Sequence, residues 1–153
     1  MAARTIFNII KALVILFGIS VSALSTIMTY DAASLNIGLK DAASSVVFHP
    51  GPTTVAVTAE ITIEHRGLLF SFSNMNVVVH IYSDAVPDGP VASDKEIFTI
   101  NPGERKTLTF DFEIERSIFN VTSEWTIVIN VDGIMSLMDK NFVSFTLNYT
   151  ETV

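Results

Sequence analysis

The histidines are the residues of this sequence whose type most directly suggests metal binding or acid–base catalysis. His49, His65 and His80 do not have the spacing of a metal-ligating motif. His80 lies between Val79 and Ile81 in an apolar stretch that is typical of a strand, where a structural histidine is the commoner case. The histidines therefore predict neither a metal site nor a catalytic dyad.

Acidic side chains give the second candidate for chemistry. Asp111, Glu113 and Glu115 alternate along one stretch, so they share one face of a strand and could together offer oxygen ligands to calcium. A calcium site normally draws ligands from a turned loop as well, which favours a solvated outer face here. The chain has no cysteine and no glycine-rich phosphate loop. We predict no enzymatic activity, no cofactor, no metal and no identifiable small-molecule substrate.

Two sequence patterns match the acceptor for N-glycosylation, Asn-X-Ser/Thr. They begin at Asn120 and Asn148. Matches of this kind are expected by chance in a chain rich in Asn, Ser and Thr. They become relevant only if the surrounding domain lies outside the cytoplasm.

Two stretches alternate apolar and polar residues with a period of two, which indicates strands that bury one face of an antiparallel sheet. They are residues 54–64 and 106–115, the second with Leu108, Phe110 and Phe112 on its inner face. Residues 101–104 (NPGE) have the proline and glycine positions of a type II turn, which predicts a hairpin before the second stretch.

Shorter strands are expected over residues 35–39, 45–48, 76–83, 95–100, 124–132 and 142–149. Residues 133–140 fit either a loop or one helical turn. After the N-terminal apolar stretch there is no long amphipathic helix, so the pattern predicts an antiparallel immunoglobulin/fibronectin-III-like β-sandwich of about seven strands.

Residues 67–72 (GLLFSF) crowd four apolar side chains beside a turn. They either enter the core as a strand or project as an apolar edge. An exposed Leu69 and Phe70 would mark an interface with a partner or the membrane.

The longest uncharged stretch, residues 12–30 (ALVILFGISVSALSTIMTY), divides the chain into two parts. A helix of this length spans about 28 Å, close to the roughly 30 Å of a bilayer's hydrocarbon core. Arg4 and Lys11 precede it and Asp31 follows it, so the positive-inside rule places the N-terminus in the cytoplasm. We expect a single-pass anchor over residues 1–30 and an extracytoplasmic domain over residues 31–153.

Two other readings of the apolar stretch stay open. Residues 21–23 (VSA) would pass as a signal-peptide cleavage site, although the apolar region continues beyond them and is longer than a signal peptide needs. A pilin-type leader cut between Ala12 and Leu13 would instead leave the helix as the spine of a filament. Its part before Lys11 is amphipathic, whereas such leaders are normally short and polar.

A stripe of small residues, Gly18, Ser22, Ser25 and Thr29, lies on one face of the predicted helix. In lipid such stripes let helix backbones approach closely, which predicts packing against another membrane protein or a copy of the same chain. The alternative is that the hydroxyls bond back to their own helix.

Charge is distributed unevenly between the two parts. Residues 1–30 carry two basic residues and no acid, and the rest carries seven basic and sixteen acidic residues, a net charge of −9. An acidic domain argues against binding nucleic acid or an anionic membrane surface, because both require basic patches. The partners expected from the sequence are therefore the lipid bilayer and, through the N-terminal helix, another membrane protein or copies of the same chain.

The succession of residues 55–64, 67–82 (GLLFSFSNMNVVVHIY) and 100–104 (INPGE) leading into 108–114 resembles a known domain. It is similar to the water-stress and hypersensitive-response (WHy) domain of LEA14-like desiccation-related proteins, in a membrane-anchored archaeal form, over roughly residues 53–149. The resemblance implies a fibronectin-like β-sandwich without enzymatic activity, associated with stress tolerance or with protein and membrane contacts.

The sequence thus predicts a non-enzymatic, membrane-anchored envelope protein whose β-sandwich is a binding or accessory module. The alternative is a structural subunit of an extracellular filament or membrane assembly, packed through its N-terminal helix.

Overall fold

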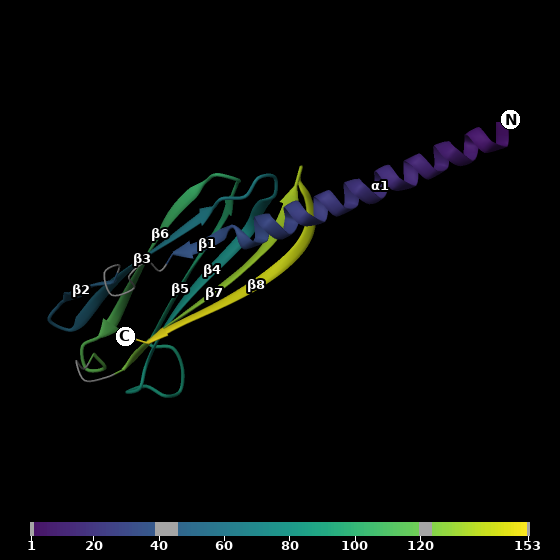
Figure 1. Cartoon of the computed structure of the whole chain (residues 1–153). Coiled ribbons are helices and arrows are strands. Elements are labelled where there is room, and N and C mark those ends of the chain that lie inside the picture. Colours follow the sequence, from purple (N-terminus) through teal and green to yellow (C-terminus); the bar gives the residue numbers. More distant parts are fainter. Residues whose placement is uncertain (1, 39–45, 120–123, 153) are drawn as a thin grey trace.

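The computed structural model describes residues 2–38, 46–119 and 124–152, and over these residues it contains one long helix followed by eight strands (Figure 1). The helix α1 (Ala2–Ala33) projects from one end of a two-layer β-structure. The strands are β1 (Leu35–Gly38), β2 (Val46–Pro50), β3 (Thr54–His65), β4 (Ser71–Ser83), β5 (Ala92–Ile100), β6 (Arg105–Glu115), β7 (Trp125–Leu137) and β8 (Lys140–Thr152).

The strands form two antiparallel sheets. In one sheet β3 is central, with β6 along one side and the short β1 and β2 along the other. The second sheet has the order β5-β4-β7-β8. The predicted antiparallel β-sandwich with one N-terminal apolar helix is confirmed.

The core lies between the two sheets and is built by the strand alternation seen in the sequence. On β3 every second side chain from Val55 to Ile63 is buried. Phe110, Phe112 and Ile114 on β6 are buried as predicted, while Leu108 is only partly buried. The opposite sheet contributes mainly the inner faces of β4 and β7 to this core.

The expected strand limits need correction in the second sheet. Strand β4 begins at Ser71, five residues before the expected start, and reaches its full length through a bulge at Asn74, whose φ is +50°. Residues 133–140 form mostly strand: β7 runs to Leu137, β8 begins at Lys140, and a two-residue turn joins them. Both expectations for residues 133–140, a loop or one helical turn, were therefore wrong except at the two turn residues.

Strand β8 is the outer strand of its sheet, which explains the exposure of its apolar face. Val143, Leu147 and Tyr149 are each more than 40 % exposed. Across from β8, the edge of the other sheet is formed by β1, with four residues, and β2, with five. These two strands are too short to cover β8, which has 13 residues.

The turn between β5 and β6 forms as the sequence predicts. Gly103 has a φ of +80°, and the Glu104 amide donates to the Asn101 carbonyl over 3.0 Å. The backbone N–H of Asn101 donates in return to the Glu104 carboxylate over 2.8 Å, and this bond lowers the pKa of the Glu104 carboxyl below its ordinary value. The type II turn is therefore reinforced by its own last side chain.

The β7–β8 turn holds two residues in an unfavourable backbone conformation, so better-suited residues should stabilise the domain. Met138 and Asp139 have φ values of +48° and +60°, a conformation that favours Asn-Gly and costs other L-residues about 1–2 kcal/mol each. Replacing both, as Met138→Asn with Asp139→Gly, should stabilise the domain by about 1 kcal/mol and raise the melting temperature by roughly 3–6 °C. Circular dichroism of the detergent-solubilised chain measures this; an unchanged or lower melting temperature would contradict it.

Candidate functional site at the helix–sheet joint

The helix passes into the β-sandwich without a flexible linker. Helix α1 ends at Ala33 and β1 starts at Leu35, which pairs with His65 at the end of β3. Between them, the Ser34 amide donates to the Tyr30 carbonyl over 2.9 Å, and the Ser34 hydroxyl donates to the Asp31 carbonyl over 2.7 Å. Ser34 therefore satisfies two of the last helical carbonyls, those of Tyr30 and Asp31, within one residue of the first strand.

The carboxylate of Asp31 holds the β3–β4 loop against this end of the helix. It accepts backbone N–H bonds from Leu68 at 2.7 Å, Leu69 at 2.9 Å and Phe70 at 2.7 Å, and Asp31 has no exposed surface. Hydrogen bonds to an ionised carboxylate are roughly twice as strong as neutral ones. Three such bonds from consecutive amides form a closed cradle for one side chain.

The imidazole of His65 completes the contact from the opposite side. Its Nε2 lies 2.7 Å from the Phe70 carbonyl, and its Nδ1 lies 3.2 Å from the Gly67 amide and 3.3 Å from the Ser34 hydroxyl. A carbonyl can only accept and an amide N–H can only donate, so the proton is on Nε2 and Nδ1 is the acceptor. The ring also packs edge-on against Phe72, at 4.6 Å between centroids.

Gly67 is required by the closeness of these groups. A Cβ added to Gly67 would overlap the Cε1 atom of His65 and come within 2.9 Å of the Asp31 side-chain carbon Cγ. We call Asp31, Ser34, His65, Gly67 and the loop amides of residues 68–70 the helix–sheet joint.

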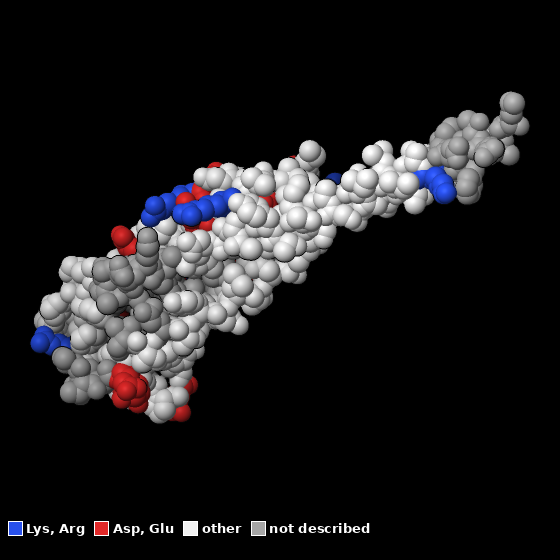
Figure 2. Space-filling model, in the orientation of Figure 1, with Lys and Arg blue, Asp and Glu red and all other residues white. Residues whose placement is uncertain are grey.

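Among residues 10–33 of α1, contact with the domain is confined to the last part of the helix. Leu24, Ile27 and Met28 are half-buried against the core cluster, whereas every residue from Ile10 to Ala23 is exposed. The region Ile10–Ala33 is long and apolar enough to cross a membrane by length and composition. Figure 2 shows this projecting helix as a largely uncharged surface, in contrast to the domain, which carries both acidic and basic side chains on the same face.

The small-residue stripe lies on the exposed part of the helix and its end. Gly18, Ser22, Ser25 and Thr29 are all exposed, and no atom lies within 4 Å of a Cβ placed on Gly18. The Thr29 hydroxyl donates to the Ser25 carbonyl over 3.0 Å, so this residue follows the back-bonding alternative. Packing against a second helix stays a prediction.

The two residues of the expected apolar edge have different environments. Phe70 is completely buried, with its amide bound to Asp31 and its ring edge-on to Phe142, so it belongs to the core. Leu69 is 40 % exposed and the adjacent Leu68 is 69 % exposed. Of the expected pair, only Leu69 can contribute to a surface.

The remaining sequence candidates lie apart from the joint. Asn148 is exposed on the edge strand β8, and Asn120 lies outside the described residues. The acidic row of β6 is solvent-exposed, with Asp111 accepting a bond from the Thr58 hydroxyl at 2.7 Å. Among residues 2–38, 46–119 and 124–152, no group of three or more His, Asp or Glu side chains could hold a metal ion.

An open groove of about 240 Å³ lies where the two sheets part, between β1 and β8. Its lining is Leu35, Ile37, Ile129, Val131, Leu147, Asn148 and Tyr149. Apart from the Asn148 amide and the Tyr149 hydroxyl, the side chains of this lining are apolar.

No family model and no curated protein matches the sequence. Solved structures with similar arrangements include a putative beta-galactosidase from Bacteroides fragilis, at 15% identity and a TM-score of 0.45, covering 75% of this chain and 17% of that one. A crystal structure of a protein from Archaeoglobus fulgidus has 13% identity and a TM-score of 0.39, with 78% of this chain and 98% of that chain covered. This chain spans less than a fifth of the galactosidase, and these likenesses concern the fold alone.

Sequence reasoning did not identify the joint. The signals that could have found it are an acidic residue directly after the apolar stretch and a glycine two residues after a strand-terminal histidine. Neither signal is specific in the sequence alone, because residue 31 meets residues 65–70 only in the folded chain.

Asp31→Asn tests the carboxylate cradle. The amide has one acceptor oxygen and a donor NH₂ that would face backbone N–H groups, so buried donors lose their partner. We expect the domain to lose about 2–4 kcal/mol of stability. Denaturant unfolding of the solubilised chain measures this, with Asp88→Asn, an exposed loop carboxylate, as the control that should change little. Equal effects of the two variants would contradict the role of Asp31.

Gly67→Ala tests the close packing. The added methyl group must displace His65 or Asp31, and we expect a loss of roughly 2 kcal/mol or more together with faster hydrogen exchange at the Leu69 and Phe70 amides. Gly89→Ala is the matched control, because nothing lies within 4 Å of its added Cβ. If both variants melt at the same temperature, the joint tolerates the methyl group and its packing is not tight.

Proposed function

We propose that this chain is a single-pass membrane protein that presents a non-catalytic β-sandwich in a fixed orientation at the membrane surface, as a binding or accessory module of the cell envelope. The observation that carries this proposal is the helix–sheet joint. It connects an apolar helix to the sandwich through buried, charge-assisted hydrogen bonds instead of a flexible tether.

The surface of the projecting helix supports a lipid environment. Val14, Leu16 and Phe17 are 62–72 % exposed and belong to a continuous apolar surface. Soluble proteins seldom expose such a surface, because burying apolar area is worth about 25 cal/mol per Å². A bilayer covers it without any further protein partner.

Charge supports the orientation in which the sandwich lies outside the cytoplasm. Arg4 and Lys11 are the only charged residues before the apolar stretch, and the chain after residue 30 has a net charge of −9. This arrangement also agrees with the resemblance to membrane-anchored LEA14-like proteins, which would place the sandwich among stress-related modules.

The same helix could instead be covered by copies of itself in a filament. The exposed stripe of Gly18, Ser22, Ser25 and Thr29 favours this second candidate, because small residues permit close helix packing. The two functions differ in what covers the helix and in whether the chain stays in the membrane.

Fractionation of native cells tests the proposal. We expect the chain to remain in the membrane pellet after carbonate extraction and to keep its full mass. Once the outer layers of the cells are opened, protease added from outside should digest the sandwich. Release into the supernatant, a mass lacking residues 1–12 or 1–23, or regular polymers in negative-stain micrographs would contradict the membrane-anchored form.

A further inference from the structure

We infer that the helix-facing end of the β-sandwich itself enters the membrane interface, with the tip of the β7–β8 hairpin and the β3–β4 loop in contact with lipid. This inference rests on the proposed function, because it requires α1 to cross the bilayer. It adds a second lipid contact that is made by the domain and not by the helix.

The length of the free helix supplies the first argument. The charge-free stretch begins after Lys11, and Leu24 already packs against the domain. Residues 12–23 rise only about 18 Å along a helix, whereas the hydrocarbon core is roughly 30 Å thick. Snorkelling of Lys11 recovers part of this difference. The rest can come from the apolar residues before Lys11, within residues 6–10, and from residues 24–30, which lie beside the domain and belong to the span Ile10–Ala33. Burying the whole of that span brings this end of the domain to the membrane interface.

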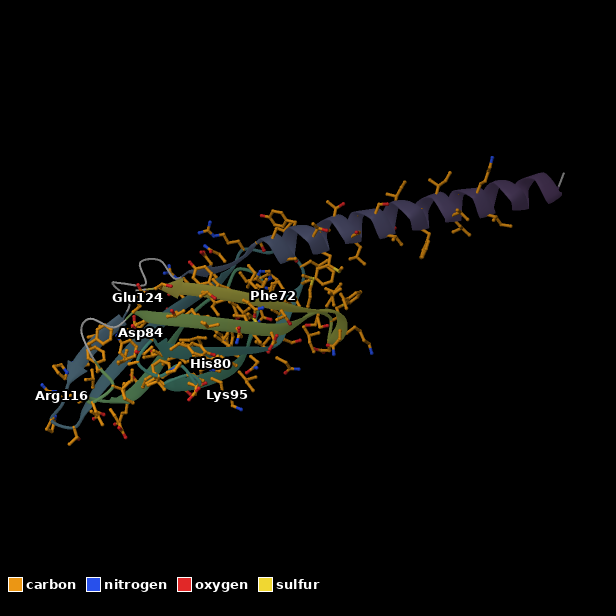
Figure 3. The ribbon with its side chains drawn as sticks, turned by 90° about the horizontal axis from the view of Figure 1, so that it is seen from below. Phe72, His80, Asp84, Lys95, Arg116 and Glu124 are labelled. Carbon is orange, nitrogen blue, oxygen red and sulfur yellow. The ribbon has the colours of Figure 1, made fainter. Side chains whose placement is uncertain are left out.

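The domain has apolar side chains where this contact requires them. The pairing of Ser71 with Ser136 puts the start of β4 beside the end of β7, so the loops before β4 and after β7 lie at the same end. Exposed apolar residues in and beside these two loops form what we call the proximal apolar patch: Leu68, Leu69, Met138, Phe142 and Val143. Figure 3 shows that Phe72 lies toward this helix end of the sandwich, while Asp84, Arg116 and Glu124 lie toward the opposite end.

A basic residue lies near the apolar residues of both the β3–β4 loop and the β7–β8 turn. Arg66 precedes Leu68 in its loop, with its guanidinium paired to the Glu64 carboxylate at 2.9 Å, and Lys140 is the first residue of β8, directly after the β7–β8 turn. Basic side chains next to exposed apolar ones are typical of segments that lie in the headgroup region. Asp139 is also exposed at the hairpin tip, which places the tip among the headgroups and not within the hydrocarbon.

The backbone of Met138 provides an independent argument. Met138 is 87 % exposed and has a φ of +48°, in a turn where Asn or Gly would be unstrained. A large apolar side chain is thus held in water at a strained position where it packs against nothing. The two-residue turn requires a positive φ at both Met138 and Asp139, so the conformation follows from the hairpin. The choice of an exposed methionine at this position is what contact with lipid would explain.

The absence of cysteine from the chain makes a direct test simple. Three single-cysteine variants, Met138→Cys, Phe17→Cys and Asp88→Cys, carry an environment-sensitive fluorophore on the full chain in phosphatidylcholine vesicles with brominated acyl chains. All three positions are exposed, so labelling should leave the melting temperature unchanged. Phe17 reports the anchor, Met138 the proximal apolar patch, and Asp88 the opposite end of the domain.

We expect about a twofold loss of emission at Phe17 and a smaller but clear loss at Met138, because the hairpin tip lies at the boundary between headgroups and acyl chains. Both positions should be protected from aqueous iodide, and Asp88 should show neither effect. If Phe17 is quenched by lipid while Met138 behaves like Asp88, the inference is overturned and the membrane anchor stands. If Phe17 itself is not quenched by lipid, the proposed function fails and the inference fails with it.

Discussion

The rest of this structure depends on one buried carboxylate. Asp31 occupies the last turn of a long helix, where the helix dipole disfavours an acidic side chain, and no basic residue lies in that turn. Locally its position is therefore unfavourable. Three amides of the β3–β4 loop reverse this balance, since each donates to the carboxylate within 2.9 Å. A residue that destabilises the isolated helix thus stabilises the helix in contact with the sandwich.

This contact fixes the geometry of the sheet as well as that of the helix. Because Ser34 is the only residue between α1 and β1, the direction of the helix sets where Leu35 meets His65, and with it the register of β1 on β3. A slip by one residue would turn Ile37 to the opposite face of the sheet. His65 and its neighbour resist such a slip, because Nδ1 of His65 lies 3.3 Å from the Ser34 hydroxyl and the Arg66 amide donates to the Ser34 carbonyl over 3.3 Å.

Local sequence patterns were sufficient where one physical effect dominates. Strands β3 and β6 follow from their alternation, and the turn before β6 follows from Pro102 and Gly103, because burial of one face and a positive φ leave direct signatures. The β7–β8 hairpin was not predicted, since Met138 and Asp139 are not residues that favour its turn. The joint could not be predicted, because Asp31 and the loop amides that it binds are 37–39 residues apart and meet only in the folded chain.

A rigid joint changes what an exposed side chain near the helix can mean. For a helix that crosses a bilayer, as we propose for α1, a flexible linker would let the sandwich stand at any distance from the membrane. The exposure of Leu69 or Met138 would then carry no information about depth. With Asp31 locked into the loop, the domain cannot rise away from the helix without breaking buried, charge-assisted bonds. The depth of the helix then determines the depth of the β7–β8 tip. For this reason the cradle around Asp31, and not the apolar helix alone, decides how the sandwich would meet a membrane.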